Sequence, residues 1–144
     1  MCKVLVGNEI ENHITINILG KTYPESKDYG DGNWLGSEIY FSLGAFNGSI
    51  KAHLRSSEFE TFLEKVKILY DKLKGVAEYS SMEGWLSIKI TGDGRGHMLI
   101  EGVICDDPDI GNKLIFIINY DQTGLKNTLE GLEYILEKYP VIGK

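Results

Sequence analysis

Apolar side chains recur at every second position in several short segments of this chain, and no other feature restricts the possible folds as strongly. The pattern is clearest at Ile14, Ile16 and Ile18, which alternate with Thr15, Asn17 and Leu19. A period of two residues indicates a β-strand with one buried face. Such segments predict strands near residues 3–7, 13–19, 86–90, 98–104 and 113–120, and a hairpin over 34–54.

The hairpin over 34–54 has two possible turns. Asn47 and Gly48 form the strongest short hairpin signal and would place Leu43 opposite Ala52. Gly44 and Ala45 form a second possible turn, which keeps the same side chains together on each face. The sequence does not choose between them.

The glycine-rich residues 92–96 are interpreted as a turn between two strands. They lack the Lys-Ser/Thr of a phosphate-binding P-loop and do not open a helix. If the loop carries an extra residue, Ile90 faces Met98, whereas a tight turn would set His97 against Ile90.

The segment 113–120 is apolar on both faces, with Leu114 and Phe116 on one and Ile115 and Ile117 on the other. This pattern is typical of a strand in the centre of a sheet, or of one covered by a second layer.

Two segments show helical periodicity. Ser57 and Glu60 have the spacing of a capping box, an apolar stripe follows, and Gly75 is placed to end the helix, so we expect a helix over 57–74. A second helix is expected over 123–139, capped by Asp121 or Thr123 and ended by Pro140. Its apolar stripe also covers one face only.

These elements predict an α+β domain over residues 1–144. We expect two layers, a mostly antiparallel sheet of about six to seven strands and two helices that cover it. The polar residues 21–33 are expected to form a surface loop between the first strand pair and the hairpin.

The charge balance argues against nucleic acid as a direct partner. The chain has 15 Lys and Arg against 21 Asp and Glu, a formal net charge of −6. Phosphate binding needs a clustered basic surface, so the balance mildly favours a basic protein partner, although it could serve solubility alone. With two cysteines and no CxxC pair, signal-peptide pattern or apolar run long enough to cross a membrane, we expect a cytoplasmic protein.

No motif predicts catalysis, a metal or a cofactor. Cys105 ends an apolar strand, where a buried, inert thiol is the usual finding, and a nucleophile would need a base such as His97 within reach. The three histidines lie on separate predicted strands without ligand spacing. We therefore predict that the chain is not an enzyme.

The remaining functional candidates are surfaces. Tyr29 and Trp34 lie in or beside the loop that carries three acidic residues, and aromatic residues beside charges suit a protein interface. Trp34 is, however, better explained by packing at the core edge. A second acidic loop follows Cys105. The full set of predicted partner-binding residues is Glu25, Asp28, Tyr29, Asp31, Trp34, Asp106, Asp107 and Asp109.

Three segments, in this order along the chain, resemble the WapI-type immunity proteins of bacteria. They are DGNWLGSEIYFSLGAFNGSIKAHL, LSIKITGDGRGHMLIEGVI and LIFIINYDQTGL, and the resemblance extends over about 31–139. It implies a cytoplasmic antidote, without cofactor or catalytic residues, for the C-terminal toxin domain of a secreted or wall-associated protein. In the best-known case that domain cleaves RNA.

We therefore predict an immunity protein that binds and neutralises a bacterial toxin domain, with a nuclease as the expected target. Two alternatives are a small-molecule-binding domain with a cavity between sheet and helices, and an enzyme that uses Cys105 or a carboxylate pair.

Overall fold

A computed structural model describes residues 2–144, so Met1, the first residue of the predicted domain, lies outside the described residues. Residues 2–144 form eight strands and two helices. In chain order they are β1 (Cys2–Gly7), β2 (His13–Lys21), β3 (Trp34–Leu43), β4 (Phe46–Arg55), α1 (Ser56–Lys72), β5 (Lys74–Ser80), β6 (Leu86–Asp93), β7 (His97–Cys105), β8 (Lys113–Asp121) and α2 (Gln122–Lys138).

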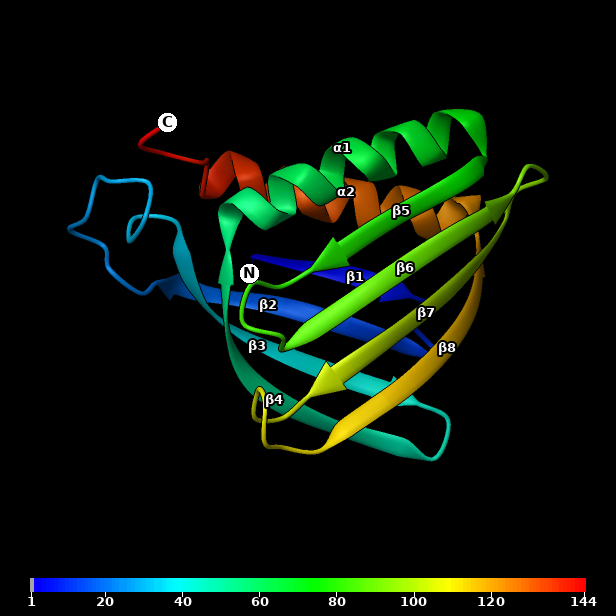
Figure 1. The fold of residues 1–144 in the computed structure, drawn as a ribbon. Helices are drawn as coiled ribbons and strands as arrows, with labels where there is room; N and C mark the ends of the chain where they lie inside the picture. Colours follow the sequence, from blue (N-terminus) through cyan, green and yellow to red (C-terminus); the bar gives the residue numbers. More distant parts are fainter. Residues whose placement is uncertain (1) are drawn as a thin grey trace.

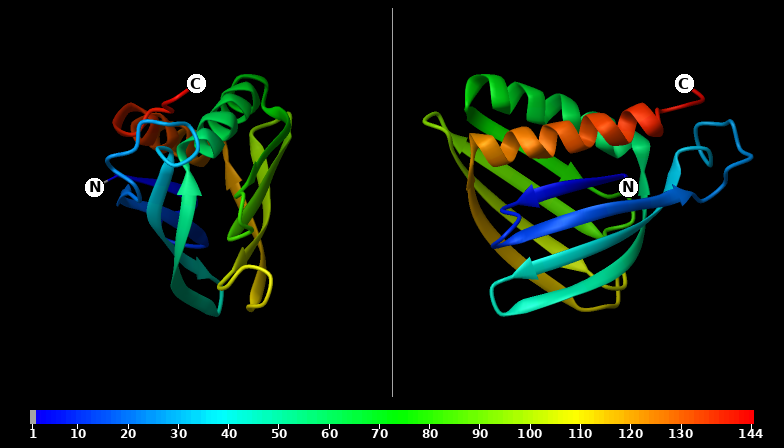
Figure 2. Two further views of the ribbon diagram at one scale, coloured as in Figure 1. Left: turned by 60° about the vertical axis from the view of Figure 1, so that its left-hand side comes forward. Right: turned by 180° about the vertical axis from the view of Figure 1, so that it is seen from behind.

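The strands form two four-stranded sheets, in the orders β1-β2-β3-β4 and β5-β6-β7-β8, and every neighbouring pair is antiparallel. The α+β class, the antiparallel pairing and the two helices are confirmed. The strand count differs in detail from the expected six to seven, and the strands divide between two sheets. The sheets face each other, and both helices lie at one end of the space between them (Figures 1 and 2).

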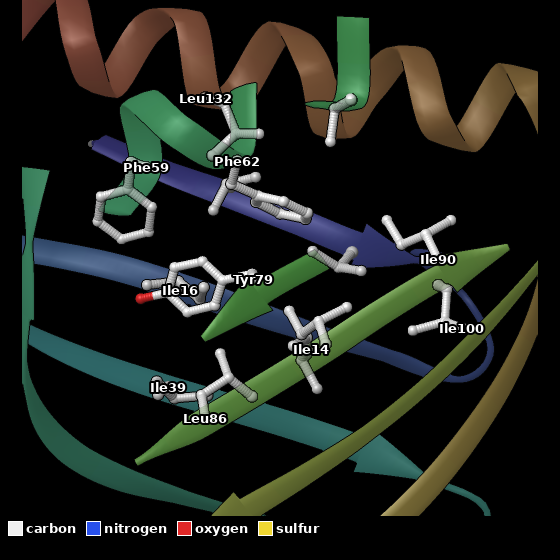
Figure 3. Close-up of a cluster of buried hydrophobic side chains, with 14 of the residues drawn as sticks. Ile14, Ile16, Ile39, Phe59, Phe62, Tyr79, Leu86, Ile90, Ile100 and Leu132 are labelled. Atoms are coloured by element: carbon white, nitrogen blue, oxygen red, sulfur yellow. The ribbon is translucent and has the colours of Figure 1, made fainter. Parts of the chain in front are cut away.

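The core lies between the sheets and under the helices, where side chains from both sheets meet (Figure 3). Ile14, Ile16 and Ile39 of the first sheet are almost fully buried, as are Ile90 and Ile100 of the second. The period-2 pattern therefore identified the buried face correctly. Burial of an isoleucine side chain contributes about 1.5–3 kcal/mol.

Helix α1 joins the second sheet through aromatic packing. The ring of Tyr79 stacks on Phe59, with centroids 5.6 Å apart, and meets Phe62 edge to face at 5.4 Å. Such pairs add about 0.5–1.5 kcal/mol beyond the buried area. They fix how α1 lies along β5.

The helix boundaries lie within two residues of the predicted ones, but the first cap differs. The carboxylate of Glu58, rather than Glu60, accepts the N–H of Arg55 at 3.0 Å, so the cap lies two residues before the predicted Ser57. Leu73 ends α1 with a positive φ of 61°. At α2, Asp121 is the capping residue, because its Oδ1 accepts the N–H of Gly124.

Strand β5 was not predicted. Its outward-facing side chains include those of Lys74 and Glu78. Its inward-facing side chains in the core are those of Ala77 and Tyr79. Gly75, interpreted as a helix stop, is already the second residue of this strand.

The turn of the β3–β4 hairpin lies at Gly44 and Ala45, because Leu43 pairs with Phe46. Gly44 has a φ of +63°, which glycine tolerates without the steric cost of a side chain. The alternative pair, Asn47 and Gly48, lies inside β4.

Both registers expected for β6 and β7 are wrong. Ile90 pairs with Ile100, because β6 continues to Asp93 and the turn is formed by residues 94–96. The carboxylate of Asp93 accepts the N–H groups of Arg95 at 2.6 Å and His97 at 3.2 Å. These bonds stabilise a turn that begins at residue 94, two residues later than the predicted turn over 92–96.

Strand β8 is not central but lies at the edge of its sheet, and no second layer formed by residues 2–144 covers its outer face. Ile115 and Ile117 there are 80% and 60% exposed. Among residues 2–144, neither helix combines the length and apolar composition required to cross a membrane.

Candidate protein-binding surface

The loop between β2 and β3, residues 22–33, projects from one end of the molecule (Figure 1; Figure 2, right). It carries Glu25, Asp28, Tyr29 and Asp31, all of which are exposed. We call residues 22–33 the acidic loop. Its position beyond the sheets makes its side chains accessible to a macromolecular partner.

The buried side chain of Arg55 holds the acidic loop in one conformation. Its exposed fraction is 4%, and its guanidinium donates to the carbonyl oxygens of Tyr29 at 2.7 Å and Gly30 at 2.6 Å. The same group lies 5.3 Å from the Tyr29 ring centroid and 4.9 Å from that of Trp34. A planar guanidinium can make both contacts at once, which an ammonium group cannot.

Asn33 fixes the loop from its other end. Its side chain is buried, and Nδ2 donates to the carbonyl oxygens of Tyr29 and Ile142, both at 3.0 Å. Its Oδ1 accepts from the Ile142 N–H at 3.0 Å and from the Ser56 hydroxyl at 3.1 Å. The loop is therefore joined to the C-terminal segment and to the start of α1.

Two acidic side chains of the loop are left free by these contacts. Asp28 is partly used within the loop, because its Oδ1 accepts the N–H of Asp31 at 2.6 Å. The carboxylates of Glu25 and Asp31 make no hydrogen bond within residues 2–144. They are the loop carboxylates most available for an external cation.

Trp34 is half-buried, packed against Arg55 on the inside and open to a recess on the outside. The expected packing of Trp34 at the core edge therefore accounts only for the side of its ring that faces Arg55. The recess has a volume of about 240 Å³ and is lined by Thr22, Tyr23, Trp34, His53 and Glu83. Aromatic rings and one carboxylate are a suitable lining for a basic side chain.

The second predicted acidic segment is the loop 106–112 between β7 and β8. Asp106 closes this loop, because its carboxylate accepts from the Asn112 N–H at 2.7 Å and from Nδ2 at 3.1 Å. Hydrogen bonds from the Asn112 side chain and backbone lower the pKa of Asp106. Asp107 and Asp109 are exposed.

The structure does not bring the two acidic segments into one cluster. Both lie toward the same side of the molecule, on the left in Figure 1. The acidic loop lies beside the helices, whereas the loop 106–112 lies at the far end of the sheets from them (Figures 1 and 2). Within residues 2–144, no three His, Cys, Asp or Glu side chains are placed to share a metal ion.

The thiol–imidazole pair that catalysis by Cys105 would need does not form between Cys105 and His97. Cys105 is buried and its thiol donates to the carbonyl oxygen of Asp107 at 3.2 Å. His97 is exposed and its Nδ1 lies 3.2 Å from the Asp93 carboxylate. The two residues begin and end the same strand, about 26 Å apart at the usual rise per residue.

The polar groups beside α1 are bound to one another. A hollow of about 320 Å³ there is lined by Glu58 and Tyr79 among others. The Glu58 carboxylate accepts from the N–H groups of Arg55 at 3.0 Å and Met82 at 2.6 Å. Burial raises the pKa of Glu58, an effect these hydrogen bonds partly oppose. The carboxylate thus connects the start of α1 to the turn after β5.

Sequence reasoning missed Arg55 and Asn33, the two residues that organise the acidic loop. The available signals were weak: a single arginine directly before a helix, and an asparagine directly before a strand. Arg55 binds the carbonyl of Gly30, 25 positions away, and Asn33 binds that of Ile142, 109 positions away, and no local pattern reveals such partners.

Comparison with known proteins gave one family match. The model of the immunity protein WapI-like family matches residues 5–140. It thus includes most of the first thirty residues, which lay outside the resemblance noted from the motifs. No curated protein matches the chain. Among solved structures, that of the plant transcriptional regulator PBF-2 is 13% identical, with a TM-score of 0.49, and the alignment covers 96% of this chain and 84% of that one.

Proposed function

This chain belongs to the WapI-like immunity protein family, and on that premise we propose that it binds and neutralises a cognate toxin domain in the bacterial cytoplasm. Family membership indicates an immunity function. The partner we propose is the C-terminal toxin domain of a secreted or wall-associated protein, with nuclease activity. Residues 1–144 act in this proposal as one binding domain, without cofactor, membrane or direct nucleic-acid contact.

The observation that carries the proposal of a binding site is the fixed conformation of the acidic loop. Arg55 and Asn33 together bind the backbone of Tyr29, Gly30 and Ile142. A loop that is ordered before the partner arrives loses less conformational entropy on binding, so more of the contact energy appears as affinity. Exposed Tyr29 supplies an aromatic contact on the loop.

Charge supports a basic partner. The chain carries a formal net charge of −6, and the Glu25 and Asp31 carboxylates project from its surface. A nuclease that binds phosphates presents a basic substrate groove. Complementary charge increases the rate of association and fixes the orientation of the two proteins. An antidote seated on that groove would exclude the nucleic acid.

The recess beside the loop extends this surface. Trp34 and Tyr23 provide aromatic rings and Glu83 a carboxylate. We propose that a lysine or arginine of the toxin enters it. A cation near an aromatic face is stabilised by about 0.5–2 kcal/mol, more when water is excluded.

The experiment uses the cognate toxin domain, which we expect a neighbouring reading frame to encode. Binding is measured at several salt concentrations for the wild type and for Glu25→Lys/Asp31→Lys. The expected result is a roughly tenfold or greater loss in association rate and a weaker salt dependence. The matched control is Glu130→Lys/Glu133→Lys on α2, which makes the same charge change on exposed positions outside the loop.

Equal effects of the two double variants would show that only net charge matters and would remove the acidic loop from the interface. Asp107→Lys tests the second acidic loop separately. Failure of the wild type to bind the toxin domain, or to protect cells that express it, would contradict the proposed function as a whole.

A further inference from the structure

The outer face of the second sheet, turned away from the core, carries exposed apolar side chains at one hairpin. Ile115 and Ile117 of β8 lie on this face, because Phe116 between them is buried and successive side chains of a strand alternate. Val103 of β7 pairs with Ile115, and Ile110 is exposed in the loop that joins the two strands. We call Val103, Ile110, Ile115 and Ile117 the outer patch. Apolar side chains gathered in this way mark an interaction site.

The outer patch contains a hollow that suits an apolar side chain of a partner. Its volume is about 380 Å³, and Val103, Ile115 and Ile117 line it together with Ser87 and Glu101. Ser87 pairs with Val103 on the neighbouring strand, so a short side chain lies in the same row as the valine. The side chains that anchor protein interfaces enter pockets of this kind. The second sheet lies in front in Figure 1, with the outer face toward the viewer.

The charges around the outer patch are mainly acidic. Four carboxylates and two ammonium groups belong to the outer face and the loop at its end: Glu78, Glu101, Asp107, Asp109, Lys89 and Lys113. The ion pairs found within residues 2–144 involve none of them. The chain as a whole has a formal net charge of −6. Two copies joined through this face would therefore repel each other, whereas a basic protein is attracted to it.

We propose that the outer patch is a second contact surface for the basic toxin domain. An apolar side chain of the toxin enters the hollow, and lysine or arginine side chains of the toxin lie against Glu101, Asp107 and Asp109. An apolar centre with a polar rim is the usual arrangement of a protein interface. The inference rests on the proposed function, because it gives the same partner a second contact.

The position of the outer patch allows one partner to contact both surfaces. The loop 106–112, at one end of the patch, and the acidic loop lie toward the same side of the molecule (Figure 1). A toxin domain that extends along this side contacts both. The two surfaces then act on different rates, because complementary charge mainly increases the association rate, whereas buried apolar anchors slow dissociation.

The first experiment compares the kinetics of toxin-domain binding for the wild type and Ile115→Thr/Ile117→Thr. Threonine keeps the branched Cβ that strands favour and reduces the apolar surface. The expected result is a roughly tenfold or greater rise in the dissociation constant, mostly through faster dissociation. The control Ile10→Thr/Ile68→Thr changes two exposed isoleucines outside the patch and should leave both rates within about twofold. Thermal unfolding of both variants reports whether the fold is intact.

The second experiment measures whether the toxin domain covers the outer patch. Ile115→Cys places a thiol there, and its rate of reaction with a maleimide is followed from the mass of the labelled chain. At a toxin concentration about tenfold above the dissociation constant, the reaction is expected to slow roughly tenfold, because about a tenth of the sites stay free. Ile68→Cys on α1 should react at an unchanged rate. The wild type, with Cys2 and Cys105 buried, reports the background.

Unchanged dissociation of Ile115→Thr/Ile117→Thr, or unchanged labelling of Ile115→Cys, would overturn the second contact and leave the proposed function intact, since the wild type still binds. A wild type that does not bind the toxin domain would contradict both. Slow labelling of Ile115→Cys without toxin, together with a mass in solution of twice 16.1 kDa, would show that a second copy occupies the patch and would also overturn the inference.

Discussion

The side-chain amide of Asn33 binds both backbone polar groups of Ile142, a residue 109 positions later. Nδ2 donates to its carbonyl oxygen and Oδ1 accepts from its N–H, each at 3.0 Å. Because Asn33 has an exposed fraction of 1%, water cannot replace either bond. The pair ties the acidic loop to the C-terminal segment of the chain.

Asn33→Asp is expected to destabilise the fold. A carboxylate cannot donate to the carbonyl oxygens of Tyr29 and Ile142, and it places a charge where almost no water reaches. Arg55 still donates to Tyr29, but the Ile142 carbonyl loses its donor, and this loss and the buried charge together cost about 3 kcal/mol in the free energy of unfolding. Urea denaturation at neutral pH measures the change. Asn127→Asp, on an exposed position of α2, is the control and should change stability by much less.

The sequence predicted the secondary structure better than its assembly. Alternation at Ile14, Ile16 and Ile18 states that one face of a strand is buried, and the structure confirms it. Alternation does not say which strands share a sheet, since that depends on contacts between distant residues. The division into two sheets was therefore not predictable.

Strand β8 shows a second limit of sequence patterns. Apolar side chains on both faces are typical of a covered strand, yet Ile115 and Ile117 are exposed. The pattern indicates that burial of these side chains would be favourable. It does not show whether the same chain or another molecule buries them.

The sequence predicted the exposed residues of the candidate surface but not the buried residues that hold them in place. The acidic and aromatic residues near Tyr29 were identified because they lie close together along the sequence. Arg55 and Asn33, which hold the loop, were not, because each acts on backbone carbonyls that folding brings close. A side chain that binds backbone groups has no partner side chain, so no second residue type in the sequence indicates the contact.

Arg55→Lys is expected to loosen the acidic loop. A lysine cannot donate to the carbonyl oxygens of Tyr29 and Gly30 in the same planar arrangement, and it loses the stacked contact with Trp34. The loop should open more often, and trypsin should cut after Lys27 faster, by about tenfold if the local stability falls by ~1.4 kcal/mol. Arg95→Lys, in the exposed turn at 94–96, is the control. An unchanged cutting rate at Lys27 would contradict the role given to Arg55.

Gly102→Ala is expected to destabilise the second sheet. A Cβ at this position would lie 2.6 Å from the carbonyl oxygen of Ser87 and against the ring of Phe116, its partner on β8. Crowding of this kind in a packed core costs about 1–3 kcal/mol. Thermal and urea unfolding measure the loss. The control is Gly36→Ala on β3, where the nearest atom would lie 3.7 Å away and stability should change little.

The half-buried carboxylate of Glu58 is expected to make stability depend on pH. Burial raises its pKa above the ordinary value of 4.5, while hydrogen bonds from Arg55 and Met82 oppose the shift. The folded state therefore takes up a proton at a higher pH than the unfolded state does. This contribution to stability is fully present below the ordinary pKa and is lost as the pH rises through the raised one.

The test compares the free energies of unfolding of the wild type and Glu58→Gln, which cannot titrate. Their difference should move in favour of the wild type as the pH falls from 7 to 4. A constant difference, or one that moves the other way, would show that the hydrogen bonds rather than burial dominate at this carboxylate.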